Sequence, residues 1–306
     1  ISMENAHKVN FFTKITVPVL CGVLALINFG SLSVTAAKAE APVPEARYCA
    51  EGEARYLDEG DEPSYDGQGG IVGASYDVYY DYKTIVEDVS LYSVPSFGNG
   101  DSSMTNTCAP VAGTNIVGYY DRWSPNLIPD YTPGAMVSGN YRYYPDMSRE
   151  PVKNTIASLY NLMQTNVNGG GTSETEFMSG LTTYVTNAGY SLSYTSFHQN
   201  ATMVDLPKLK TAINAGKVGL VMCSKYNFVY ALMHYDGYTR VSKENGDAGH
   251  MMMVYGYKTI AYYKDGVNFQ TDTFLYTCSG YGAAETGYMQ LNDYSQINNA
   301  LVMTIA

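Results

Sequence analysis

The sequence predicts an α+β protein, because helical and strand-like patterns fall in different halves of the chain. Four segments with apolar residues at helical spacing lie between residues 108 and 215. Short apolar runs typical of buried strands prevail from residue 218 to residue 291. No internal repeat is present. A helix-rich half followed by a strand-rich half favours α+β over a doubly wound fold.

Residues 1–39 resemble a secretory signal peptide. Lys8 and Lys14 precede an apolar run over 15–34, and Ala-Lys-Ala follows at 37–39. A permanent membrane anchor is the alternative, but proline, asparagine and glycine interrupt the run. We therefore expect cleavage after Ala39 and a protein that is secreted to the extracellular space or the cell surface.

The charge balance excludes several kinds of partner. The formal net charge is −11 at pH 7, and Lys and Arg together number 18 against 29 Asp and Glu. A chain this acidic gains nothing from counterion release on DNA or RNA. It also has no attraction to anionic membrane surfaces. We expect no nucleic-acid partner, no membrane association after signal cleavage, and a monomer.

Residues 40–70 differ in composition from the segments on both sides. They contain nine acidic residues, three prolines and few branched apolar side chains. This composition predicts an acidic linker or a short pro-segment that inhibits the mature protein. A single domain over 71–306 follows.

Local patterns predict the elements of this domain. The alternation over 76–82 indicates a strand, and Pro110 suits the first turn of a helix that starts near Cys108 and that Asn106 or Thr107 caps. Further helices are expected at 152–165, 174–188 and 205–215. Strands are expected at 218–223, 250–257, 274–277 and 287–291, with a hairpin over 262–273.

Cys108 is the first candidate for chemistry. A helix N-terminus carries partial positive charge, which stabilises a thiolate and makes it a better nucleophile at neutral pH. The alternative is a small apolar residue packed under the helix.

His250 is the candidate base, because the sequence contains four histidines and His7 leaves with the signal peptide. His198 lies in a polar segment and His234 has no obvious partner. His250 follows Gly249 at the head of the apolar strand, where a strand end fixes a ring in place. It lies 142 residues after Cys108, within the spacing given for papain-like enzymes.

Three motifs together resemble secreted bacterial papain-like cysteine peptidases, especially the C39-like group. Residues 106–120 resemble the nucleophile helix of these enzymes, and residues 249–257 resemble their histidine strand. Residues 279–288 resemble the segment that reads Asn-Ser-Trp-Gly in papain. The resemblance spans about residues 95–292. It implies a papain-like two-lobed fold, in which an N-terminal helical lobe with the Cys helix packs against a C-terminal antiparallel sheet.

The resemblance also assigns supporting roles, and this chain departs from the pattern at both positions. Ser279 occupies the slot of the asparagine that orients the histidine, with Asp272 and Asn268 as alternatives. No glutamine precedes Cys108 at the oxyanion position. Asn106 or Asn99 could supply an amide there, and Asn106 could equally be the helix cap.

The function that the resemblance implies is hydrolysis of peptide bonds in a peptide or protein substrate, through a Cys-His mechanism and an acyl-enzyme. No cofactor or metal is expected, because no nucleotide loop, zinc spacing or EF-hand pattern is present. Two alternatives stay open: a catalytically silent papain-like binding module, and a thiol amidase or acyltransferase that acts on cell-wall material. Of the other cysteines, Cys223 and Cys278 are expected to be buried and inert rather than joined, and Cys49 lies in the acidic segment.

Overall fold

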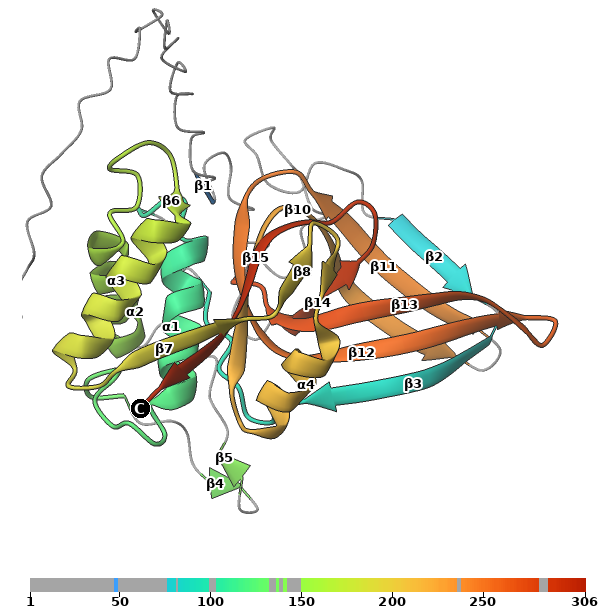
Figure 1. Ribbon diagram of the computed structural model, residues 1–306, viewed down its shortest axis with the longest axis horizontal. Helices are drawn as coiled ribbons and strands as arrows, with labels where there is room; N and C mark the ends of the chain where they lie inside the picture. The colour runs from blue at the N-terminus through green and yellow to red at the C-terminus, as the bar shows by residue number, and fades with distance from the viewer. Residues whose placement is uncertain are drawn as a thin grey trace, which may run out of the picture. The chain divides into compact units, whose positions relative to one another are not determined.

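The computed structural model describes residues 47–48, 76–80, 82–98, 103–131, 136–137, 140–141, 150–235, 238–280 and 286–306. All of them belong to the unit Pro44–Ala306. They form an α+β architecture, as the sequence predicts (Figure 1). The expected signal peptide over 1–39 and most of the acidic segment over 40–70 lie outside the described residues.

Four helices occur in the described ranges: α1 (Cys108–Tyr120), α2 (Glu150–Leu162), α3 (Glu174–Asn187) and α4 (Leu206–Asn214). Each helix overlaps the segment in which the sequence predicts one. Local residues define their starts. Ser173 caps α3 in a reciprocal pair with Glu176, and Asp205 caps α4.

The strands of the described ranges are mostly in the second half of the chain. Those of the large sheet are β2 (Tyr76–Tyr80), β3 (Tyr82–Ser90), β7 (Leu192–Ser196), β10 (Val218–Tyr235), β11 (Tyr238–Gly246), β12 (His250–Lys264), β13 (Val267–Cys278), β14 (Thr286–Leu291) and β15 (Gln296–Ile305). Three two-stranded sheets pair β1 (Arg47–Tyr48) with β6 (Thr172–Ser173), β4 (Met136–Val137) with β5 (Asn140–Tyr141), and β8 (His198–Asn200) with β9 (Met203–Val204).

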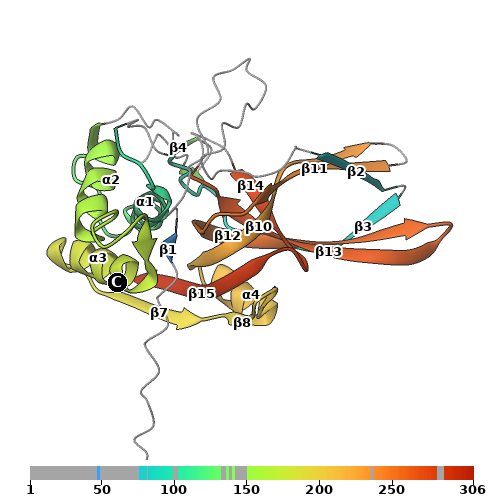
Figure 2. The same cartoon turned by 90° about the horizontal axis from the view of Figure 1, so that it is seen from above.

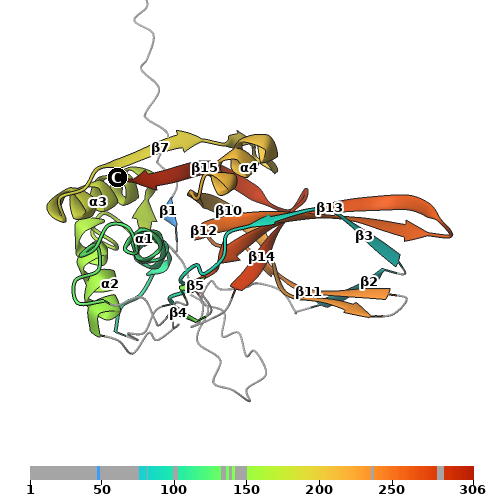
Figure 3. The same cartoon turned by 90° about the horizontal axis from the view of Figure 1, so that it is seen from below.

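The large sheet is antiparallel in every pairing and folds back on itself. Its strand order is β2-β11-β10-β14-β13-β12-β3, and β15 pairs with both β10 and β7. Because β10 pairs with β14 through one half and with β12 through the other, the strands β10, β14, β13 and β12 form a closed ring. Figures 2 and 3 show that α1, α2 and α3 gather on one side of this sheet and that α4 lies apart from them.

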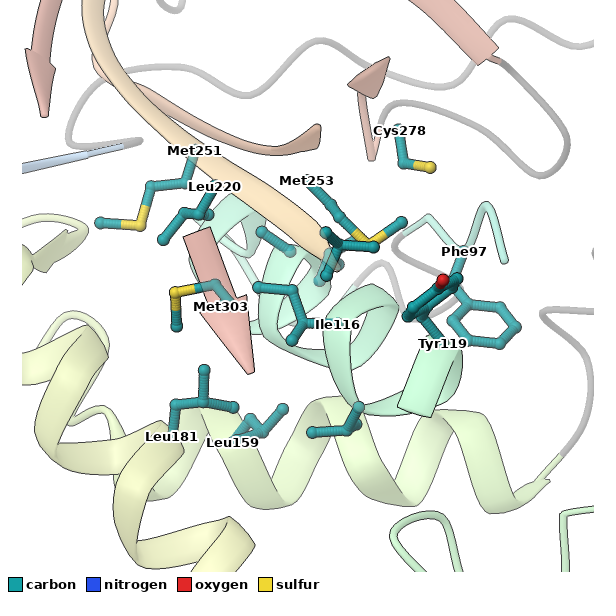
Figure 4. Close-up of a cluster of buried hydrophobic side chains, with 14 of the residues drawn as sticks. Phe97, Ile116, Tyr119, Leu159, Leu181, Leu220, Met251, Met253, Cys278 and Met303 are labelled. Carbon is teal, nitrogen blue, oxygen red and sulfur yellow. The ribbon is translucent and has the colours of Figure 1, made fainter. Parts of the chain in front are cut away.

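The start of β12 is buried on both faces, as its continuous apolar run predicts. Successive side chains of a strand point to opposite faces. Met251 and Met253 accordingly join the hydrophobic cluster around α1, whereas Met252 and Val254 join a second cluster that includes side chains of α4. Figure 4 shows the first cluster, with side chains of the sheet on one side of α1 and side chains of α2 and α3 on the other.

Helix α1 lies at the centre of the first cluster, and all of its residues are buried. The sequence predicts an apolar stripe along one side of this helix, whereas in the structure the whole helix is buried. Two glycines permit it. A Cβ atom at Gly113 would lie 3.0 Å from Met163 Cε, and one at Gly118 would lie 2.7 Å from Phe97 Cε2. Asn115 is buried within the helix because it hydrogen-bonds both the N–H and the carbonyl of Phe97.

Candidate active site

Cys108 is the first residue of α1 and is buried, with 6% of its surface exposed. Its sulfur is joined in a disulfide. Cys223 and Cys278 are free, so its partner lies outside the described residues. The sequence leads to a free thiol at this position, and the structure instead holds the sulfur in its oxidised form.

His250 is the first residue of β12, and its ring makes a hydrogen bond to the turn after β13. Nε2 lies 2.8 Å from the backbone oxygen of Ser279. A carbonyl oxygen only accepts, so Nε2 carries the hydrogen and donates it. In the neutral ring the lone pair is then on Nδ1. The fold therefore selects the tautomer in which Nδ1 is the basic nitrogen.

Tyr226 of β10 stacks on the His250 ring, with the ring centroids 5.2 Å apart and the planes inclined by 22°. Both side chains are buried. The stacking adds a second constraint on the imidazole, this time on its face. Sequence reasoning missed Tyr226, because nothing distinguishes one tyrosine among 30. In the structure Gly246 makes room for this ring, since a Cβ atom there would overlap Tyr226.

Burial controls the charge of His250. Desolvation lowers the pKa of His250 to about 4, and the hydrogen bond to Ser279 opposes the shift without cancelling it. With Cys108 in a disulfide, His250 is therefore neutral at pH 7 and keeps its Nδ1 lone pair.

The turn after β13 brings Ser279, the hydrogen-bond partner of His250, close to α1. Gly280 follows Ser279 with a φ of +80°, a conformation that suits glycine. A Cβ atom at Gly280 would lie 3.1 Å from Val111 Cγ1 in the first turn of α1. Helix α1 also packs directly on β12. The structure thus brings the elements of Cys108, His250 and Ser279 to one place.

Ser279 contacts the histidine in a way that differs from its expected role. The contact uses the backbone carbonyl of Ser279, whereas the sequence expectation concerns its hydroxyl. The two alternatives are wrong. Asp272 pairs with Ile260, ten positions along β12 from His250, which is roughly 30 Å at about 3.3 Å per residue. Asn268 pairs with Tyr263, still further along the strand.

Asn106 is not the cap of α1. The cap position belongs to Thr107, whose side chain makes no capping bond. Asn106 has a φ of +58°, in the left-handed region that asparagine tolerates. Its amide donates to Asn166 Oδ1 at 2.7 Å, so this amide group is committed to a loop rather than to the N-terminus of the helix. Asn99, the other candidate amide, lies outside the described residues.

Cys223 and Cys278 are buried and free, as expected. Burial raises the pKa of Cys278 to about 12 and the pKa of Cys223 further still. The Cys278 thiol donates to the carbonyl of Pro95 at 3.0 Å. The Cys223 thiol lies 3.4 Å from the carbonyl of His250, its partner across the β10–β12 ladder. Both are packing residues.

The other histidines lie elsewhere. His198 is in β8, where Nε2 contacts the carbonyl of Ile297 at 3.1 Å. His234 is in β10, eleven positions after Cys223. A cavity of about 740 Å³ opens between α4 and β7, with Lys208 and Lys217 in its wall, and includes none of the predicted site residues.

Two kinds of feature were sought in the described part of the chain, a metal site and a helix that could span a membrane, and neither is found there. No group of three or more His, Cys, Asp and Glu side chains in these ranges could hold a metal ion. None of the helices described has the length and hydropathy needed to cross a bilayer.

Neither the models of known protein families nor the curated proteins include a match to this chain.

The lowered pKa of His250 predicts a pH-dependent stability. The unfolded chain binds a proton near pH 6.5 and the folded chain only near pH 4, so the contribution of His250 is present above pH 6.5 and is lost as the pH falls through 4. The loss is on the order of 3 kcal/mol. His250→Gln keeps a donor for Ser279 but does not titrate. Urea unfolding should show His250→Gln gaining stability relative to wild type as the pH falls between these values.

Asp121 provides a control, because its contribution to stability should change with pH in the direction opposite to that of His250. Burial raises the pKa of Asp121 to about 6, so its contribution is present below pH 3.8 and is lost as the pH rises through 6. Asp121→Asn should therefore gain stability relative to wild type as the pH rises. A stability difference between His250→Gln and wild type that does not change with pH would contradict the burial of His250.

Proposed function

We propose that this chain is a secreted cysteine peptidase of papain-like, two-lobed fold. Cys108 is its nucleophile, His250 is its general base and acid, and the carbonyl of Ser279 positions the histidine. The observation that carries the proposal is the fixed tautomer of His250. A buried imidazole that donates through Nε2 to Ser279 keeps a basic Nδ1 where β12 meets α1, the helix that Cys108 begins.

The arrangement of elements supports the two-lobed fold. Helices α1, α2 and α3 pack together, and the closed ring of β10, β14, β13 and β12 lies to one side of them (Figure 2). The nucleophile helix belongs to the first group, and the histidine strand belongs to the second. The first two motifs of the sequence thus fall on α1 and β12, and the third begins directly after β13 and reaches β14.

The chemistry is acyl transfer. In the reduced protein the Cys108 thiol gives its proton to Nδ1 of His250, and the thiolate so formed attacks a peptide carbonyl. The carbon–nitrogen bond breaks as the imidazolium gives its proton to the departing amine. Neutral His250 then takes a proton from water, the resulting hydroxide attacks the thioester, and the carbon–sulfur bond breaks. The N-terminus of α1 stabilises the oxyanion at each stage.

A peptide with a thiol-directed electrophile tests this proposal. The reduced wild-type protein should gain the mass of one peptidyl chloromethyl ketone adduct, and peptide mapping should place the adduct on Cys108. His250→Gln retains the thiol but lacks the base, so its labelling should be slower by about 100-fold. An adduct on Cys278, or equal rates for the two proteins, would contradict the assignment.

A silent binding module is the second candidate, and the disulfide at Cys108 favours it. A structural disulfide stabilises a fold and needs no base nearby. The fixed ring of His250 then has no chemical role. The two candidates differ in the reduced protein, since a binding module would hold peptides without cleaving them and would show no selective alkylation of Cys108.

A further inference from the structure

Strand β7 forms an edge of the large sheet. Among the described strands it pairs only with β15. Figures 2 and 3 show β7 along the outer margin of the sheet, with β15 on its inner side. Side chains on both faces of β7 are exposed, and Tyr194 at its centre has 53% of its surface in solvent. An edge of this kind presents backbone N–H and C=O groups to which another strand can bind.

The other two edges of this sheet carry features that oppose further pairing. β2 and β3 also have one partner each among the described strands. β2 contains Asp77, whereas β3 contains Glu87 and Asp88 and has a register shift in its ladder with β12. Charged side chains and bulges protect natural edge strands in this way. β7 consists of Leu-Ser-Tyr-Thr-Ser, without charge, proline or a register shift against β15, so its edge is open to another strand.

The ladder with β15 determines which residues of β7 face outward. Directly before β7, Ser191 and Ala306 exchange both of their backbone hydrogen bonds, at 2.8 and 3.1 Å. In an antiparallel pair every second residue bonds to the partner strand, so the odd-numbered residues of β7 bond to β15. The N–H and C=O groups of Leu192, Tyr194 and Ser196 therefore point away from β15.

We infer that β7 pairs with β7 of a second copy of this chain, in an antiparallel register centred on Tyr194. A two-fold axis there places Tyr194 opposite Tyr194 of the other copy and Leu192 opposite Ser196, and each such pair exchanges two N–H···O bonds. The contact uses the same surface on both copies, so assembly closes at a dimer. This inference does not rest on the proposed function, and it replaces the monomer expected from the sequence.

The side chains of β7 suit this register. Tyr194 lies opposite its own copy, and aromatic pairs across neighbouring strands stabilise a sheet. On the other face Ser193 lies opposite Thr195, and their hydroxyl groups can hydrogen-bond to each other. No like charges meet within the strand pair, although each copy has a formal net charge of −11.

A shift of the register by one residue on either side is less favourable. It would centre the pair on Ser193 or on Thr195 and would join only two pairs of outward-facing residues within β7, so it would form fewer backbone hydrogen bonds. Such a shift would also separate the two Tyr194 side chains. The register centred on Tyr194 therefore makes the most of this short edge.

Sedimentation velocity of the full chain tests the association. Wild type should pass from monomer to dimer as the protein concentration rises. Tyr194→Lys places two cations opposite each other and removes the aromatic pair, so the dissociation constant of the dimer should rise by about tenfold or more. Tyr92→Lys is the matched control, because Tyr92 is a tyrosine outside β7 with 83% of its surface exposed, and its replacement should leave the dimer unchanged.

A disulfide cross-link reports the register. In the inferred pairing the two Cα atoms of residue 194 lie about 5.5 Å apart, a distance that a disulfide spans. Those of residue 193 are diagonal neighbours about 7–8 Å apart, which is too far. Oxidation of Tyr194→Cys by diamide should therefore give a covalent dimer whose non-reduced digest links the peptide of residue 194 to itself. Ser193→Cys should give none.

The outcomes separate the possible occupants of this edge. A monomer at every concentration without a cross-link would overturn the inference, and so would a dimer that Tyr194→Lys leaves unchanged, since another surface would then pair. A cross-link through Ser193→Cys instead of Tyr194→Cys would overturn the register. Binding of an extended peptide by monomeric wild type, lost in Tyr194→Lys, would assign the edge to a different chain and overturn the dimer.

Discussion

Cys108→Ala is expected to lower kcat/KM for peptide hydrolysis by about 10⁴-fold or more, measured in reducing buffer. The variant lacks the only atom of the site that can form the acyl-enzyme. The His250 ring, its bond to Ser279 and the N-terminus of α1 remain, and together they leave the binding of a peptide largely intact. Hydrolysis should therefore fall through kcat, with a smaller change in KM.

Stability could mimic this loss, because Cys108 is buried and joined in a disulfide. Removal of a disulfide costs about 2–4 kcal/mol in oxidising buffer. Reducing buffer supplies the control, because there neither wild type nor Cys108→Ala holds the disulfide. Both proteins should then unfold at similar urea concentrations, and only wild type should hydrolyse peptides. Activity in folded Cys108→Ala would show that another residue is the nucleophile.

The helices could be predicted from the sequence, because three of the four described helices begin at a local signal. Pro110, the Ser173–Glu176 pair and Asp205 all act within one turn of the chain. The strands were less predictable. The run over 218–223 is only the first third of β10, which continues to Tyr235. The later part pairs with β11 and β14. Ser224, Lys225 and Asn227 separate its apolar residues 228–233 from the first run, so one long strand looks like two short segments in the sequence.

For the candidate site, the sequence predicted which elements carry the residues but not the contacts between their atoms. Cys108 and His250 could be selected because a helix start and a strand head are local features. The contact of His250 with the Ser279 carbonyl could not be predicted, because every residue has a backbone carbonyl and the direction of this one depends on the turn at Gly280. The disulfide could not be predicted either, since cysteine spacing does not determine pairing.

The second large effect is expected for His250→Gln, which should lower kcat by about 10²–10⁴-fold. The glutamine amide can donate to the Ser279 carbonyl as Nε2 does, so the packing beneath Tyr226 should be kept. An amide nitrogen has no basic lone pair, so the variant can neither activate Cys108 nor protonate the departing amine.

The matched control for this prediction is His198→Gln. His198 also contacts a backbone carbonyl through Nε2, that of Ile297 at 3.1 Å, but it lies in β8 away from α1. The same substitution there removes an imidazole and keeps a donor, so peptide hydrolysis should stay within about twofold of wild type. If both variants lost activity equally, the loss would come from packing. If His250→Gln stayed active while Cys108 remained essential, another group would have to be the base, and the fixed Nε2 tautomer would have no part in the reaction.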